Sequence, residues 1–148
     1  MIQFNLYIIS LLFISIFFSI LFIQSGLDKI IDFSGNLNYF KTHFEKSILK
    51  KWVKSLLIVV TCLECVTGLV FLAAIVFYGL SVGDDQFSII YAHWFVGWGL
   101  ILSAITLCCL FLGQRLAKDY VGAANLINYF IVNLLGLIAL GWVEFNLI

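Results

Sequence analysis

The sequence predicts an all-α integral membrane protein, a single four-helix bundle with an amphipathic interfacial helix between its first and second spans. Of the 148 residues, 64% are hydrophobic and 11% are charged, whereas an average soluble domain has about 25% charged residues. Four apolar stretches are long enough to cross a bilayer, whose hydrocarbon core needs roughly 20 helical residues. Because backbone groups in lipid must find partners within the protein, we expect these stretches to be helices.

The predicted spans cover about residues 4–23, 55–80, 88–112 and 121–143 of one domain, 1–148. The first and fourth contain no charged side chain, the second contains Glu64, and the third contains His93. No basic residue precedes the first span and no small-x-small site follows it. A cleaved signal peptide has both of these features. Because the sequence has neither, we expect the first span to remain as a membrane anchor.

The basic residues predict the orientation of the chain in the membrane. All 8 Lys and Arg residues lie between spans one and two or between spans three and four. Because basic loops face the cytoplasm, we expect both termini to lie outside. A composition rich in Ile, Phe, Asn and Lys is typical of an AT-rich bacterial genome, so we expect the membrane to be a bacterial inner membrane. The 8 basic residues are balanced by 8 acidic ones, which argues against a nucleic-acid partner.

The connection between spans one and two has helical periodicity over about residues 37–54. Its apolar positions recur every three or four residues, and its lysines fall on the opposite side. This pattern predicts a helix lying in the headgroup layer, and a docking surface for a partner is the alternative. The apolar positions are Leu37, Phe40, Phe44, Ile48 and Trp52, and the lysines are Lys46, Lys50 and Lys54.

Glu64 is expected to face the interior of the bundle, because a carboxyl group inside a span is costly in lipid. Counting helical rise from the cytoplasmic ends puts Asn128, Ser15, Ser19 and Ser103 at similar depth. We therefore predict a polar layer in which Glu64, neutral through desolvation, bonds to Asn128 or a serine. Two interpretations remain open. In the first, the Glu64 carboxyl only links neighbouring helices by hydrogen bonds. In the second, it serves as a proton relay or as a polar contact for a bound quinone headgroup.

Two pairs of cysteines lie in the membrane spans. Cys62 and Cys65 form a C-x-x-C pair with Glu64 between them, and Cys108 and Cys109 are adjacent. A redox thiol needs a helix N-terminus, a base or a metal to become a thiolate, and this apolar, acidic setting offers none. We interpret the four as packing residues, with a thiol–disulfide centre as the alternative. No metal site is expected, because zinc needs four converging ligands.

Three motifs together resemble the DoxX-like family of four-helix membrane proteins. They are "FIQSGLDKIIDF" with Gly26 and Lys29, the E-x-x-x-G of Glu64 and Gly68, and "GQRLAKDYVGAANLINYF" before the last span. The resemblance covers most of the chain. It departs at the start of span one, where the family often has an arginine. It implies a compact bundle linked to membrane oxidoreductase assemblies, and it implies no catalytic residues.

The sequence therefore predicts a small integral subunit or accessory protein of a larger inner-membrane complex, redox- or quinone-linked. Membrane lipids and other membrane subunits are the expected partners, and a quinone is the one cofactor left open. Two alternatives are a structural or assembly protein without chemistry of its own and a membrane thiol–disulfide oxidoreductase.

Overall fold

The computed structural model describes residues 6–81 and 86–147, and this part of the chain is helical without any strand. Five α-helices and one 3-10 helix follow one another, which confirms the predicted all-α fold. They are α1 (Leu6–Ile31), α2 (Phe33–His43), η1 (Ile48–Lys51), α3 (Val53–Ser81), α4 (Gln86–Leu116) and α5 (Tyr120–Leu147).

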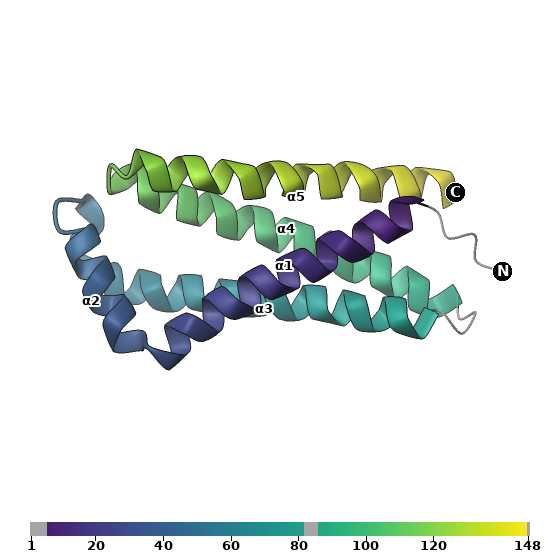
Figure 1. Ribbon diagram of the computed structural model, residues 1–148, viewed down its shortest axis with the longest axis horizontal. Helices are drawn as coiled ribbons and strands as arrows, with labels where there is room; N and C mark the ends of the chain where they lie inside the picture. Colours follow the sequence, from purple (N-terminus) through teal and green to yellow (C-terminus); the bar gives the residue numbers. More distant parts are fainter. Residues whose placement is uncertain (1–5, 82–85, 148) are drawn as a thin grey trace.

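The four long helices α1, α3, α4 and α5 are each long and apolar enough to cross a membrane. Both α1 and α4 contact α3 and α5, so the four close into a bundle. Helix α2 lies across one end of this bundle, and α1 begins and α5 ends at the other (Figure 1). The protein is therefore a multi-pass membrane protein with the predicted alternation of its spans.

The centre of the bundle is filled by a column of stacked phenylalanines. The ring of Phe18 lies 5.7 Å from that of Phe22 and 5.4 Å from that of Phe71, measured between centroids. A side chain at Gly99 would bring its Cβ within 2.8 Å of the Phe71 ring, so this glycine makes room for the stack between α3 and α4. The column holds the helices at fixed spacing next to the site described below.

A short helix does lie between the first two spans, but the predicted bounds of 37–54 are wrong. Helix α2 starts at Phe33, where the Asp32 side chain accepts a hydrogen bond of 2.9 Å from the Gly35 N–H and caps it. It ends at His43, and a turn leads into η1, which is capped by Ser47. Ser47 thus caps a separate 3-10 helix within a segment whose apolar periodicity alone favours one helix.

The first span also runs further than expected. Hydropathy placed its end near residue 23, whereas α1 continues to Ile31. The extra turns contain Ser25, Gly26 and Lys29, and they carry a basic side chain to the edge of the bundle core.

Candidate functional site

A close crossing of α1 over α3 positions the site. A Cβ added at Gly26 would lie 2.6 Å from Cys65 Sγ, and one added at Gly68 would lie 2.6 Å from Ile23 Cγ1 and 2.9 Å from its backbone N. Neither position therefore has space for a side chain. The two glycines, both among the positions that carry the family resemblance, allow the two backbones to approach closely.

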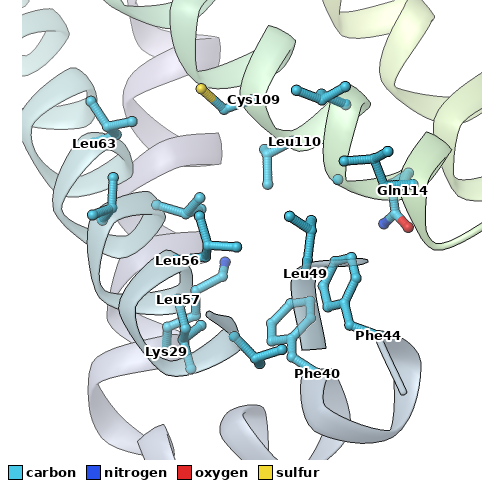
Figure 2. Close-up of a pocket in the computed structure, with 16 residues that line it drawn as sticks. Lys29, Phe40, Phe44, Leu49, Leu56, Leu57, Leu63, Cys109, Leu110 and Gln114 are labelled. Carbon is cyan, nitrogen blue, oxygen red and sulfur yellow. The ribbon is translucent and has the colours of Figure 1, made fainter. Parts of the chain in front are cut away.

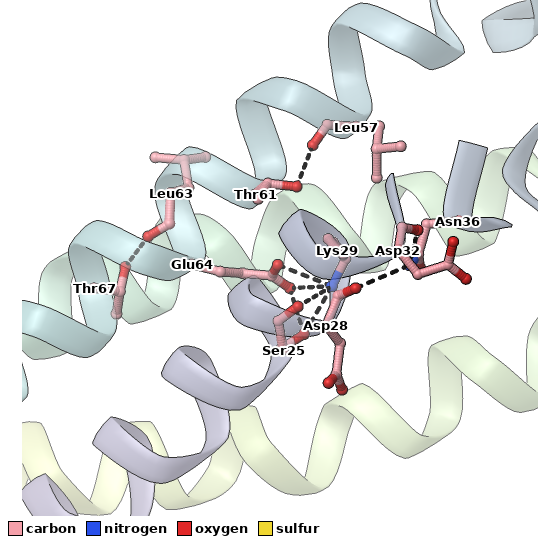
Figure 3. Close-up of polar contacts among 10 residues, drawn as sticks. All are labelled: Ser25, Asp28, Lys29, Asp32, Asn36, Leu57, Thr61, Leu63, Glu64 and Thr67. Atoms are coloured by element: carbon pink, nitrogen blue, oxygen red, sulfur yellow. Dashed lines mark hydrogen bonds and ion pairs between the residues drawn. The ribbon is translucent and has the colours of Figure 1, made fainter. Parts of the chain in front are cut away.

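A buried ion pair lies immediately beside this crossing (Figure 3). Lys29 Nζ is 2.9 Å from Glu64 Oε2 and donates a hydrogen bond of 3.1 Å to Glu64 Oε1. It also donates to Ser25 Oγ at 2.8 Å and to the Ser25 carbonyl at 3.1 Å, while Ser25 Oγ donates to Glu64 Oε1 at 2.9 Å. The Lys29 and Glu64 side chains are only 12% and 2% exposed.

The ammonium group of Lys29 finds its hydrogen-bond partners within the cluster of Lys29, Glu64 and Ser25. The ammonium has three N–H donors, and three hydrogen-bond acceptors lie around it. The carboxylate at 2.9 Å balances its positive charge. The arrangement is therefore electrically neutral and leaves no free ammonium donor for an anion.

The expected partners of Glu64 were wrong. Glu64 bonds to Lys29 and Ser25 of α1, and not to Asn128 or the serines of the predicted layer. The error came from ending the first span too early, which placed Lys29 in a loop.

The other residues of the predicted layer lie in different places. Ser15, Ser19 and Ser103 are buried, whereas Asn128 is exposed on the outer face of α5. Ser15 Oγ donates to a carbonyl one turn earlier in its own helix at 2.8 Å, and Ser19 Oγ donates to the Gly68 carbonyl at 3.4 Å. These hydroxyls serve helix packing and do not contact the ion pair.

Sequence reasoning missed Asn133, which is fully buried in α5. Its amide nitrogen and oxygen have no hydrogen-bond partner among the described residues, and the same holds for Ser103 Oγ on α4. A Cβ at Gly136 would lie 2.8 Å from Leu100, so the register of α5 on α4 puts Asn133 and Ser103 at one level. Helical phase was the available signal, because Asn133 shares the inward face with Leu140.

An apolar pocket of about 220 Å³ lies at the α2 end of the bundle, between α2, η1, α3 and α4. It forms because α3 and α4 continue past the end of α1, while the chain turns away into α2. Figure 2 shows Phe40, Phe44 and Leu49 across the pocket from Leu63 and Cys109, with the Lys29 nitrogen at its side. Apart from Lys29, Cys109 and Gln114, the pocket is lined by the hydrocarbon side chains of Leu, Val and Phe residues and by one glycine.

A hydrogen bond between α2 and α4 closes one side of the pocket. His43 Nε2 and Gln114 Oε1 are 2.9 Å apart, and the His43 ring stacks on Tyr39 with centroids 5.7 Å apart. With its oxygen engaged, the Gln114 amide keeps its nitrogen as a donor at the pocket wall (Figure 2). The pocket thus combines an apolar body with a small number of polar atoms.

All four cysteines lie in the described part of the chain, and all four are free. Cys65 is half-buried at the α1–α3 crossing, Cys109 lines the pocket, and Cys62 and Cys108 are exposed. Over residues 6–81 and 86–147, no three His, Cys, Asp or Glu side chains gather as they would around a metal ion.

The fold and site define a class, a multi-pass membrane bundle with a buried ion pair beside an apolar pocket. No protein-family model, no curated protein and no solved structure matches the chain. The resemblance to the DoxX-like family stays a prediction made from the motifs.

Proposed function

We propose that the chain is a small accessory subunit of a redox complex in a bacterial inner membrane, and that its pocket holds a neutral, quinone-like amphiphile. The observation that carries this proposal is the apolar pocket, one of whose lining residues, Lys29, has its charge balanced by Glu64. On the proposed orientation, with the basic loops in the cytoplasm, the pocket lies near the cytoplasmic headgroup layer.

The chemistry of the wall favours a neutral ligand over an anionic one. A free ammonium in an apolar cavity would attract a carboxylate or phosphate, but Lys29 is already matched by Glu64 and Ser25. The amide nitrogen of Gln114 is a donor suited to a carbonyl oxygen. A quinone offers such a carbonyl on an apolar ring, with an apolar tail that extends into lipid.

The size of the pocket supports a ring or a short stretch of chain. Pockets that enclose a drug-sized ligand have roughly 300–1,000 Å³, and this one has about 220 Å³. A whole phospholipid would not fit within it. The link to a redox complex rests on the resemblance to the DoxX-like family and would make the quinone's electron chemistry that of a partner subunit.

The test is purification from native membranes in a mild detergent, with quantification of extracted quinone and of co-purifying proteins. Replacement of Leu110 by Trp fills the pocket, and Leu69→Trp makes the same exchange on the exposed face of α3. We expect quinone to accompany the native chain and the Leu69 variant, and to fall at least tenfold with Leu110→Trp. A native chain that purifies alone and free of quinone would refute the proposal.

A structural or assembly role is the second candidate, and the pairing of Lys29 with Glu64 favours it. This ion pair, together with the hydrogen bonds of Ser25, holds α1 against α3 without any ligand. This candidate predicts that Leu110→Trp leaves the composition of the purified complex unchanged.

A further inference from the structure

The connection between α1 and α3 divides its apolar side chains between two surroundings. Phe40, Phe44 and Leu49 line the pocket, whereas Ile48 and Trp52 are 80% and 65% exposed. The apolar face expected of one long helix is therefore split, and the exposed part lies among lysines. This patch, called the basic surface below, consists of Lys46, Ile48, Lys50, Lys51, Trp52 and Lys54, all of them exposed.

The lysines of this segment have no acidic partner within the protein. Residues 41–54 contain five lysines and one glutamate, and no carboxylate of the described part of the chain lies within ion-pair distance of any of the five. Two acids at the same end of the bundle instead accept hydrogen bonds from backbone N–H groups, Asp32 from Gly35 at 2.9 Å and Asp119 from Gly122 at 2.8 Å. The segment therefore presents an unbalanced positive charge to its surroundings.

The length of α3 places the basic surface at the depth of the lipid headgroups. Helix α3 has 29 residues and is therefore about 43 Å long. A hydrocarbon core is about 30 Å thick, so the ends of α3 reach into the headgroup layers. Lys54 lies in the first turn of α3, and η1 and Trp52 come immediately before it. Helix α2, on the other side of η1, crosses the end of the bundle instead of running along its side (Figure 1).

We propose that the basic surface binds the headgroup of an anionic phospholipid, with Ile48 and Trp52 inserted among the adjoining acyl chains. Each lysine close to an anionic membrane surface strengthens binding roughly fivefold. An indole suits this depth, because its ring is apolar and its N–H can donate to a phosphate or ester oxygen. The exposed isoleucine favours lipid over an acidic protein, because the bilayer already present at this depth covers an apolar side chain without any further partner.

Quenching of Trp52 fluorescence by brominated lipids tests the contact. Replacing Trp94, Trp98 and Trp142 by phenylalanine leaves Trp52 as the one tryptophan of the chain. This variant is placed in nanodiscs of phosphatidylcholine in which a small fraction of the lipid is brominated, as phosphatidylglycerol or as phosphatidylcholine. The two degrees of quenching give the association constant of the anionic lipid relative to the zwitterionic one. We expect a ratio of at least about five, falling below about two in 1 M salt, where the Debye length is only about 3 Å.

Two double variants, made in the same chain, locate the effect. Lys50→Gln with Lys51→Gln removes two charges from the basic surface, and Lys41→Gln with Lys118→Gln removes two exposed charges from elsewhere at the same end of the bundle. We expect the first pair to lower the ratio to below about two and the second to change it less than about twofold. A ratio near one before any lysine is replaced, as a surface reserved for an acidic protein would give, would overturn the proposal.

Two further results would also overturn it, namely a ratio that does not fall in 1 M salt and an equal loss in the two double variants. All four of the replaced lysines are exposed and lie outside the pocket lining, so the bundle should keep its fold, which circular dichroism checks. The nanodiscs contain no quinone, so the outcome is independent of the proposed function.

Discussion

Removing the positive partner of the buried ion pair should destabilise the bundle strongly. At 2.9 Å and an effective dielectric constant of about 20, the Coulomb attraction between Lys29 and Glu64 is about 6 kcal/mol. Much of it is offset by the cost of removing both charges from water. Lys29→Met leaves the Glu64 carboxyl, 2% exposed, with Ser25 alone. Breaking a buried pair in this way costs about 3–5 kcal/mol.

The measurement is the free energy of unfolding in mixed micelles titrated with sodium dodecyl sulfate and followed by circular dichroism. Lys54→Met, at an exposed position in the first turn of α3, is the matched control and should change it by less than about 0.5 kcal/mol. The double variant Lys29→Met with Glu64→Leu should recover to within about 1 kcal/mol of the native chain, because no buried charge remains. A loss below 1 kcal/mol for Lys29→Met, or a double variant no more stable than Lys29→Met alone, would contradict an ionised pair.

Two further predictions use the same titration. Gly26→Ala should cost about 1–3 kcal/mol because its Cβ would lie 2.6 Å from Cys65 Sγ, whereas Gly79→Ala, with open space around it, should be neutral or slightly stabilising. Equal effects of the two would show that the α1–α3 crossing is not tightly packed. Asn133→Leu should raise stability by about 1–3 kcal/mol, because it removes a buried amide without a partner among the described residues. A loss of stability would instead indicate that a water or ligand satisfies this amide.

The spans and the helical class were predictable because they depend on quantities that a sequence states directly, the length and apolarity of each segment. Four stretches that are long and apolar enough to cross a membrane predict four transmembrane helices, and the structure has four helices of that length and apolarity. The division of the connection into α2 and η1 was less accessible. The start of each helix depends on a cap, Asp32 for α2 and Ser47 for η1, and a cap contributes about 1 kcal/mol, which competes with a continuous apolar pattern.

The partner of Glu64 was not predictable from depth alone. Its identity depends on how far α1 continues beyond its apolar core and on the register of α1 against α3. Both are tertiary properties, and the register is set where Gly26 and Gly68 let the backbones meet. The pocket could not be predicted from the sequence for the same reason. It exists only where α3 and α4 extend beyond the end of α1, and where α2 folds across the space between them.

Two asparagines of α5 show how helical phase decides the role of a polar group in a membrane. Asn128 and Asn133 are five residues apart, which is about 140° around the helix. Asn133 therefore points into the bundle and is fully buried, while Asn128 points out. Depth alone made Asn128 a candidate partner for Glu64, but helical phase places it on the outer face of α5, away from the interior of the bundle.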